Sequence, residues 1–480
     1  MRKMIPMLLL ASGLLVAIGT VASGRPDPEE IEPVEIDASG TLHWELESAI
    51  IPTRALKSPL GFSQPQIVET SDRELTAFRN VVTTQPTDYP SDNLHRGVVS
   101  LGDEQFGFVL IAAPTSSDAS KRFDMLLVFD ADGDGDLTNE TAVQGVRGER
   151  ASTMAFPPIV VQTSVDGSPC EYAVHAESTI MIQSPPGMMG SPMITGMGLS
   201  MPAPMATPQT QPRGNLKQEV MMSFRAGAFR QGTIRVDGQS LSVALLDANS
   251  NGRFDDMMPD RARNVAVAID GADRIIFRTG GSAIAADPPG THPGIALSNL
   301  ILVGGNAYTA QVASDGSSLT LEPFETELGS ILANDNGGRS GTILSGVISH
   351  PDYGTVEMKG CVSSRAIALP EGEWSFLGGT LSAGLSTTAT LTADAKTDDF
   401  TVTAGETTVL PYGDTFRGRV RSSNNPLTPG ESTSFSVDIY DGGGARCQDF
   451  VINGERPRAP ELLIQTEEGE RVHVDRFSYG

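Results

Sequence analysis

The chain has 480 residues and a formal net charge of −25, and 83 of its residues are Gly or Pro (51 and 32). A chain this acidic lacks the basic surface that nucleic acid or an anionic membrane requires, so both are excluded as partners. Aromatic residues make up only 6% of the chain, and short Val-, Ile- and Thr-rich runs alternate with turn residues. This composition predicts a mostly β fold built from several β-sandwich or β-sheet modules.

Residues 1–23 have the pattern of a signal peptide. Two basic residues precede an apolar run from Met7 to Thr20, and small residues end the segment at Ser23. Cleavage there would remove two positive charges and change the net charge from −25 to −27. We therefore expect an extracytoplasmic protein, in the periplasm, at the cell surface or secreted, with no membrane span in the mature chain. An uncleaved N-terminal anchor is the alternative.

Changes of composition along the chain divide it into seven parts. Residues 24–40 are acidic and contain Pro, which is typical of a flexible leader. Residues 184–216 are rich in Met, Pro and Gly and show no sustained hydrophobic period, which indicates a linker or a long surface loop. The expected parts are a signal peptide (1–23), an acidic leader (24–40), a β-unit with a first Asp-rich loop (41–183), a linker (184–216), a β-unit with a second such loop (217–360), a small β-sandwich-like module (361–412) and an immunoglobulin-like module (413–480).

The first loop, FDADGDGDLTNE at 129–140, follows the strand-like run MLLVF and concentrates negative charge. Its carboxylates are Asp130, Asp132, Asp134, Asp136 and Glu140. Like charges this close repel one another unless a cation neutralises them. Calcium takes about six to eight oxygen ligands, and an Asp at every second residue lets the side chains converge while a Gly permits the sharp turn. We therefore expect a Ca2+ site here, with a solvated Asp-Gly turn as the alternative.

The spacing of this loop resembles that of EF-hand and dockerin-type calcium loops. The matching positions one, three, five, six, seven and eight are Asp130, Asp132, Asp134, Gly135, Asp136 and Leu137. In the family, position seven binds through its backbone carbonyl and the apolar residue at position eight anchors the loop. Two features differ from the family: Thr141 stands where a bidentate acid is expected, and a strand enters the loop in place of a helix. The resemblance implies that Glu140, one residue earlier, or a neighbouring carboxylate completes the ligand set.

A second loop, LLDANSNGRFDD at 245–256, repeats the pattern after another apolar strand and indicates a weak internal repeat. Its expected ligands are Asp247, Asn249, Asn251, Arg253 through its carbonyl, and Asp255. Because it has fewer carboxylates, we expect weaker Ca2+ binding, with an Asn-Gly turn as the alternative. Two β-units joined by the linker, or one fused β-domain with a long inserted loop, would both account for the repeat.

Other strand-like runs include IVVQTSV (159–165), NVAVAI (264–269) and RIIFRT (274–279). In the last third, IALPEGEWSFLGG (367–379) resembles transthyretin-like β-sandwich modules. The evenly spaced short strands after residue 415 resemble an immunoglobulin-like sandwich. As a whole, the chain resembles exported β-rich proteins of the planctomycete type, which carry strand-then-calcium-loop units and often end in Tyr-Gly, as at Tyr479-Gly480.

Three cysteines occur, and Cys361 with Cys447 is the disulfide to test, although the sequence leaves the pairing open. Met residues at a spacing of four in the linker could bind Cu(I), with a plain flexible linker as the alternative; they are Met189, Met193, Met197, Met201 and Met205.

No nucleotide-binding, hydrolase or zinc motif is present, so no catalytic residue is expected. The function expected is that of an exported calcium-binding structural or interaction protein. The alternatives are a polysaccharide- or protein-binding module and a hydrolase with a dispersed site.

Overall fold

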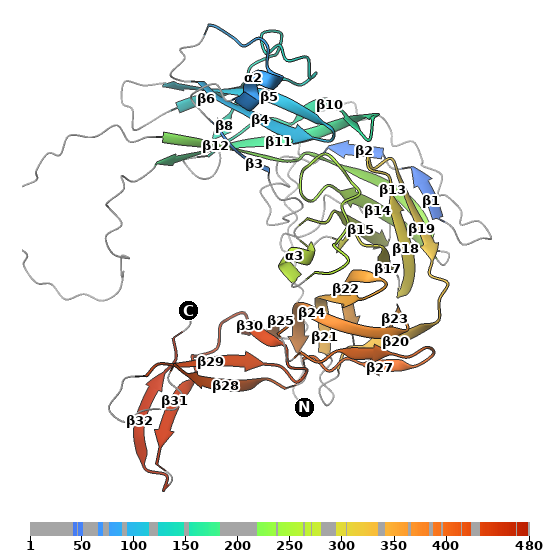
Figure 1. The fold of residues 1–480 in the computed structure, drawn as a ribbon, viewed down its shortest axis with the longest axis vertical. Coiled ribbons are helices and arrows are strands. Elements are labelled where there is room, and N and C mark those ends of the chain that lie inside the picture. The colour runs from blue at the N-terminus through green and yellow to red at the C-terminus, as the bar shows by residue number, and fades with distance from the viewer. Residues whose placement is uncertain are drawn as a thin grey trace, which may run out of the picture.

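The computed structural model confirms a mostly β protein made of several antiparallel sheets (Figure 1). It describes the following residues, apart from a few positions inside these ranges: 42–50, 66–70, 76–88, 94–114, 123–147, 153–182, 218–279, 294–334, 341–362, 366–423 and 433–478. The signal peptide, the acidic leader and the Met-rich segment with its proposed copper ligands lie outside the described residues.

Four sheets belong to the first part of the chain, and one hydrophobic core joins residues from all four of them. A four-stranded sheet has the order β4 (Leu94–Leu101), β5 (Glu104–Pro114), β6 (Phe123–Phe129) and β7 (Val143–Gln144). A six-stranded sheet has the order β3 (Gln66–Glu69), β12 (Gln218–Ala226), β11 (Ser168–Ile182), β9 (Thr153–Ala155) and β8 (Val146–Arg147), with β10 (Ile159–Val165) on β11. A five-stranded sheet has the order β16 (Ile295–Ala296), β15 (Arg274–Thr279), β14 (Gln239–Leu246), β13 (Ala228–Val236) and β2 (Glu47–Ile50). The second four-stranded sheet has the order β1 (Leu42–Glu45), β19 (Ser318–Pro323), β18 (Asn306–Val312) and β17 (Leu300–Val303).

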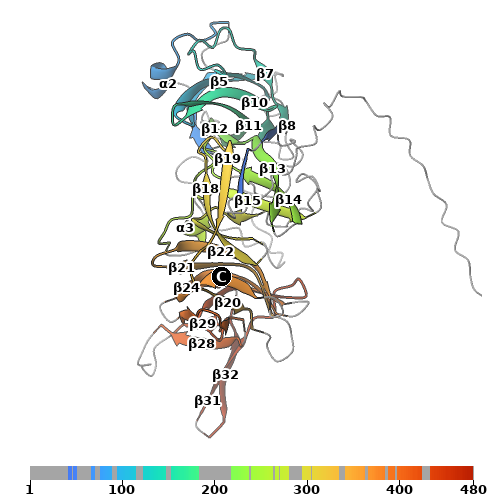
Figure 2. The ribbon, with the colours of Figure 1, turned by 90° about the vertical axis from the view of Figure 1, so that its right-hand side faces the viewer.

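Three further sheets belong to the C-terminal part. The largest has the order β22 (Gly354–Val362), β21 (Gly341–His350), β24 (Gly372–Ala383), β25 (Thr387–Thr392), β30 (Arg446–Ile452), β29 (Phe435–Tyr440) and β28 (Arg417–Ser422), with β26 (Phe400–Val402) on β24. A three-stranded sheet has the order β23 (Ile367–Pro370), β20 (Leu328–Leu332) and β27 (Thr407–Val409). These two sheets share a second core around the fully buried Trp374. The third is a hairpin of β31 (Glu461–Gln465) and β32 (Arg471–Arg476), which projects at the end of the elongated molecule opposite β4–β7 (Figure 2).

The strands on either side of the Met-rich segment pair directly with each other. Antiparallel pairing of β11 with β12 brings Ile182 opposite Gln218, so residues 183–217 connect the two strands of one hairpin. The shared core also contains residues from both expected β-units, such as Phe108 and Val243. This arrangement is the one expected for a fused β-domain with a long inserted loop.

The expected boundaries at 360/361 and 412/413 both fall within the region spanned by the eight-stranded sheet. The first lies inside β22, and the strands on either side of the second, β25 and β30, pair with each other. Cys447 is a free thiol, so the disulfide with Cys361 is not formed. The two cysteines lie on β22 and β30, and three strands separate these in the sheet. Four strand spacings amount to roughly 19 Å, well beyond the Cα separation of about 7 Å that a disulfide can bridge.

One strand predicted from the sequence is a helix. The run NVAVAI at 264–269 contains α3 (Val265–Ile269), while the first helix of the described chain is α2 (Thr76–Val81). Val265, Ala268 and Ile269 pack in one apolar cluster with Val347 and Leu377. Their spacing of three and four residues is that of a helix face, so tertiary contacts overcome the β preference of Val and Ile. The other two runs, β10 and β15, are strands with the predicted bounds.

Candidate metal centre

The first Asp-rich loop begins where β6 ends, and its first three aspartates converge. Oxygen atoms of Asp130, Asp132 and Asp134 lie within 4.8 Å of one another. Asp130 is completely buried, while the other two are exposed. Gly133 and Gly135 have φ of 72° and 76°, a conformation that favours glycine, and an added Cβ at Gly135 would lie 2.6 Å from the carbonyl oxygen of Val81. The glycines therefore let the chain turn back so that the three carboxylates face one point.

Hydrogen bonds within the loop hold Asp130 and Asp132 through one oxygen each and Asp134 through both, since Asp134 Oδ2 also accepts the side-chain amide of Asn139 at 2.9 Å. Asp130 Oδ2 accepts the amide of Gly135 at 3.2 Å, and Asp132 Oδ1 accepts the amide of Asp134 at 3.3 Å. Asp134 Oδ1 accepts the amide of Asp136 at 2.7 Å. The second oxygen of Asp130, Oδ1, is buried and has no hydrogen-bond partner. A buried acceptor without a partner costs about 1–3 kcal/mol, and more when the group is charged, so a cation at this atom would offset that cost.

The electrostatics of the loop also favour a cation. Burial raises the pKa of Asp130 above its ordinary value, and the nearby charges of Asp132, Asp134 and Glu140 raise it further, while the amide of Gly135 lowers it. Burial and negative neighbours both disfavour the carboxylate form. A bound divalent cation would reverse both effects because it is the opposite charge at contact distance.

The other two expected ligands of this loop have different places. Asp136 Oδ1 accepts the amide of Thr138 at 2.9 Å and its hydroxyl at 2.6 Å, and these bonds lower the pKa of Asp136. The structure therefore does not bring the Asp136 side chain into the group of three. Glu140 Oε1 accepts the amide of Ala131 at 2.8 Å, which places this carboxylate beside Asp130. Glu140 thus lies next to the group of three but is not a member of it.

The loop is fastened to the segment that follows α2. The carbonyl of Gly135 accepts the amides of Thr83 (2.8 Å) and Thr84 (3.2 Å), and the amide of Leu137 donates to the carbonyl of Thr84 at 3.0 Å. Leu137 is fully buried in a small core with Phe78 and Val82. The apolar residue expected at position eight thus anchors the loop, and a rigid loop would hold α2 in place.

The second loop, after β14, is closed by its own hydrogen bonds. Asp247 is fully buried and accepts the amides of Ser250, Asn251 and Gly252 and the hydroxyl of Tyr172. Both of its oxygens therefore have donors. The side-chain amides of Asn249 and Asn251 both donate to Asp256 Oδ2, at 3.0 and 2.7 Å. The N–H groups of the two Asn side chains thus direct their partial positive charge at Asp256, which is the role that the charge of a bound cation would have.

Arg253 and Asp255 of the second loop form a surface ion cluster. The Arg253 guanidinium pairs with Asp255 at 3.1 Å and with Asp166 at 3.0 Å. Asp255 also accepts the hydroxyl of Ser314, so its carboxylate is engaged away from Asp247. Two carboxylates that were not among the expected ligands meet this loop: Asp256 accepts the side-chain amides of Asn249 and Asn251, and Asp273 interacts electrostatically with Asp247. Asp256 is the next acid of the motif, but Asp273 directly precedes β15 and carried no local signal.

Asp273 completes a buried carboxylate pair with Asp247. Its oxygens accept the amides of Ala248 and Asp256, both at 2.9 Å. Burial is the main cause that raises the pKa of Asp273 well above its ordinary value, and that of Asp247 to about 6. The hydrogen bonds to Asp247 oppose this effect. The second loop is thus a buried hydrogen-bond hub that ties β14 to β15.

Removing the Tyr172 hydroxyl should weaken this hub. We expect Tyr172→Phe to lower the free energy of unfolding by about 1–3 kcal/mol, because Asp247 loses a donor in a buried site while the ring still packs against Phe254. Chemical denaturation of the two proteins measures the difference. Tyr440→Phe, at a half-exposed position whose hydroxyl meets Arg421, is the control and should change stability by less than about 0.5 kcal/mol.

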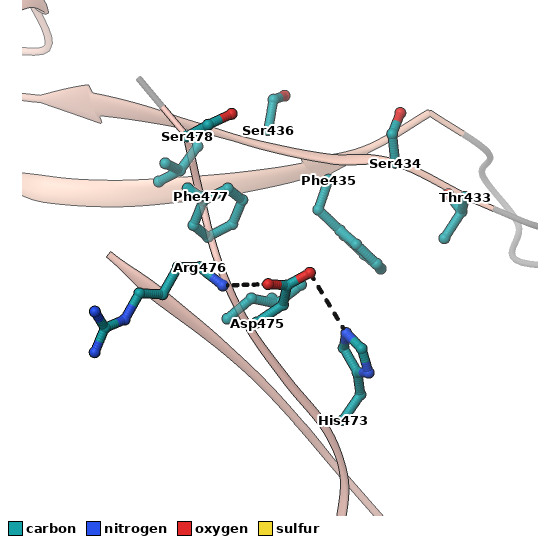
Figure 3. A pocket seen from close by; sticks show the side chains of 11 residues that line it. Thr433, Ser434, Phe435, Ser436, His473, Asp475, Arg476, Phe477 and Ser478 are labelled. Carbon is teal, nitrogen blue, oxygen red and sulfur yellow. Dashed lines mark hydrogen bonds and ion pairs between the residues drawn. The ribbon is translucent and has the colours of Figure 1, made fainter. Parts of the chain in front are cut away.

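A separate groove lies between β29 and the C-terminal hairpin (Figure 3). Its volume is about 500 Å³, within the range of small-ligand pockets. Its lining combines aromatic, charged and hydroxyl groups, among them Phe435, Phe477, His473, Asp475, Ser434 and Ser436. The imidazole of His473 lies 3.8 Å from the carboxylate of Asp475. None of these residues belongs to either Asp-rich loop.

Comparisons with protein-family models, with curated proteins and with solved structures find no match for this chain. Within the part of the chain that the structure describes, no helix is both long and apolar enough to cross a membrane. The class that the fold and the site define is therefore a mostly β protein with a candidate cation site in a strand-entered loop.

Proposed function

We propose that this is an extracytoplasmic calcium-binding protein with a structural or interaction role, in which Ca2+ rigidifies the first Asp-rich loop. The observation that carries the proposal is Asp130 Oδ1, a buried carboxylate oxygen without a partner that belongs to a cluster of three carboxylates. The signal-peptide pattern of residues 1–23 and the acidic composition support the location, because extracytoplasmic media are rich in divalent cations.

Asp130, Asp132 and Asp134 would hold the ion, and Glu140 is the nearest further carboxylate. Ca2+ would supply the positive charge that offsets their mutual repulsion. The chain contributes the geometry: the amide of Asp130 donates to Gly107 on β5 at 3.0 Å, and Gly135 and Leu137 bond to residues 83–84. An ion at this point would therefore link the end of β6 to the segment after α2, and its binding free energy would add to folding free energy.

The second loop is a weaker candidate for the same ion. Asp247, Asn249, Asn251 and the carbonyl of Arg253 keep the expected order, but their oxygens and amides already satisfy one another. Ca2+ binding there would have to break the bonds from the two Asn side chains to Asp256. We therefore propose one tighter site at the first loop and at most a much weaker one at the second.

Calorimetric titration of residues 24–480 with CaCl2 tests the proposal. We expect one main binding event, and Asp132→Asn should weaken it about tenfold or more because one ligand charge is lost. Asp136→Asn removes the same charge from the same loop, but from a side chain bonded to Thr138, so it should change affinity by less than about threefold.

Absence of heat at millimolar Ca2+ would contradict calcium binding. Equal losses from the two Asn variants would mean that only the net charge of the loop matters, and the assignment of ligands would be wrong. Titration with MgCl2 is the selectivity control, since Mg2+ demands near-octahedral geometry and gives up its water reluctantly.

Polysaccharide or protein binding is the second candidate function, and the C-terminal groove favours it. Two Phe rings beside hydroxyl, carboxylate and imidazole groups could stack on a sugar ring and bond to its hydroxyls. Titration with cell-wall oligosaccharides, monitored by the NMR signal of His473, tests this function. Phe477→Ala should abolish any shift, and shifts that survive it would place binding elsewhere.

A further inference from the structure

The C-terminal hairpin leaves an edge strand open. Among the described residues, β31 and β32 pair only with each other, and the hairpin projects from the end of the molecule (Figures 1 and 2). All six residues of β32 are exposed, whereas those of β31 alternate between exposed and half-buried. A two-stranded ribbon is marginally stable in water and gains stability when it joins a larger sheet. Both strands therefore have a free edge, and β32, whose residues are all exposed, is the more accessible one for another strand.

We infer that β32 pairs with β32 of a second copy of this chain, antiparallel and with a twofold axis at His473. The sequence of this edge, Glu470-Arg471-Val472-His473-Val474-Asp475-Arg476, opposes itself in that register with complementary charges. Arg471 faces Asp475 of the partner subunit, and each Glu470 would lie opposite an Arg476. Each Val472 would lie opposite a Val474, and the two histidines meet on the axis.

The order of the charges selects this register. A twofold axis at Val472 or Val474 would leave Glu470 or Arg476 opposite an aliphatic residue. Charged residues on edge strands often serve to prevent pairing, and like charges achieve this in every register. Here both signs occur, in an order that is attractive when the strand meets its own copy. Directly opposed unlike charges in antiparallel strands contribute roughly 0.2–1 kcal/mol each, and this register has four such pairs.

The apolar face of the hairpin supports the same pairing. Leu463, Val472 and Val474 share one face of the ribbon and are 43, 65 and 52% exposed. In the dimer, Val474 lies between Leu463 of its own copy and Val472 of the other, so two aliphatic rows cross a four-stranded sheet. Arg476 pairs with Glu461 of its own copy at 2.7 Å, but its side chain is 62% exposed and can reach a second carboxylate. The interface is isologous, as most dimer interfaces are.

Sedimentation equilibrium of residues 24–480 over a concentration series tests the inference. We expect a monomer–dimer equilibrium with a micromolar dissociation constant, because one strand per copy buries less area than a standard interface. Arg471→Glu and Asp475→Arg should each raise that constant about tenfold or more, since each makes two pairs repulsive. The double variant should restore the parent constant. An equimolar mixture of the two single variants should form heterodimers, because unlike charges face each other again at both positions.

Two further proteins keep the test decisive. Arg419→Glu reverses a charge on the exposed strand β28, outside the hairpin, and should leave the dissociation constant unchanged. His473→Cys places two thiols on the axis and should give a disulfide-linked dimer on oxidation, whereas Gln465→Cys on β31 should not. A parent protein that is monomeric at every concentration overturns the inference. So does a dimer that is indifferent to the charge reversals, or a mixture of single variants that fails to associate.

Discussion

Calcium is expected to raise the melting temperature of the chain, and Asp130→Ala is expected to remove most of that rise. For a dissociation constant of about 10⁻⁴–10⁻³ M, typical of extracellular calcium modules, about 10 mM Ca2+ stabilises the bound fold by about 1.4–2.7 kcal/mol. At about 2–4 °C for each kcal/mol, the rise amounts to several degrees. Differential scanning calorimetry with calcium and with a chelator measures it.

The chelated proteins provide the internal control for this result. Without calcium, Asp130→Ala loses the bond to Gly135 but also removes a buried oxygen that has no partner, so the two effects partly cancel. The variant should therefore melt close to the chelated parent. Asp136→Ala should keep the full calcium response, because its side chain bonds to Thr138. Identical curves for the parent with calcium and with chelator would show that the loop is only solvated charge.

Asp247→Ala is expected to destabilise the protein strongly, and more near pH 4 than near pH 7. Three backbone amides and the Tyr172 hydroxyl lose their acceptor, which costs about 3 kcal/mol or more in a buried site. Burial raises the pKa of Asp247 from 3.8 to about 6, so the folded state binds more protons than the unfolded state between these values. The stability that Asp247 contributes therefore falls as the pH rises through this window, by roughly 3 kcal/mol at 1.36 kcal/mol per pKa unit.

Chemical denaturation of the parent and the variant at pH 4, 5, 6 and 7, with chelator present, measures this difference. Comparison at each pH cancels the titration of the distant acids, which is common to both proteins. Asp273 is the exception, because the charge of Asp247 contributes to its raised pKa after burial. Asp255→Ala is the matched control, because its carboxylate pairs with Arg253 at the surface and has no part in the hub. A destabilisation that grows between pH 4 and pH 7 would contradict the direction of the Asp247 shift.

Several features of the protein could be predicted from the sequence because they depend on neighbouring residues. The alternation of aspartates and glycines after β6 is sufficient to bring Asp130, Asp132 and Asp134 together, since the turn geometry is local. The strand before the loop and the bounds of β10 and β15 follow from short apolar runs between turn residues. The mostly β class follows from composition in the same way.

The tertiary structure decided what depends on residues far apart in the chain. Asp273 lies 26 residues after Asp247, and only the pairing of β14 with β15 makes it the partner of that carboxylate. Strand arrangement also decides that Arg253 forms an ion pair with Asp166, which belongs to another turn. It separates Cys447 from Cys361 by three intervening strands. The helix at 265–269 arises from packing against Val347 and Leu377. The spacing of residues along the sequence predicts the contacts within a turn. Burial determines which oxygen of Asp130 lacks a hydrogen-bond donor, and strand pairing determines that β32 has an open edge.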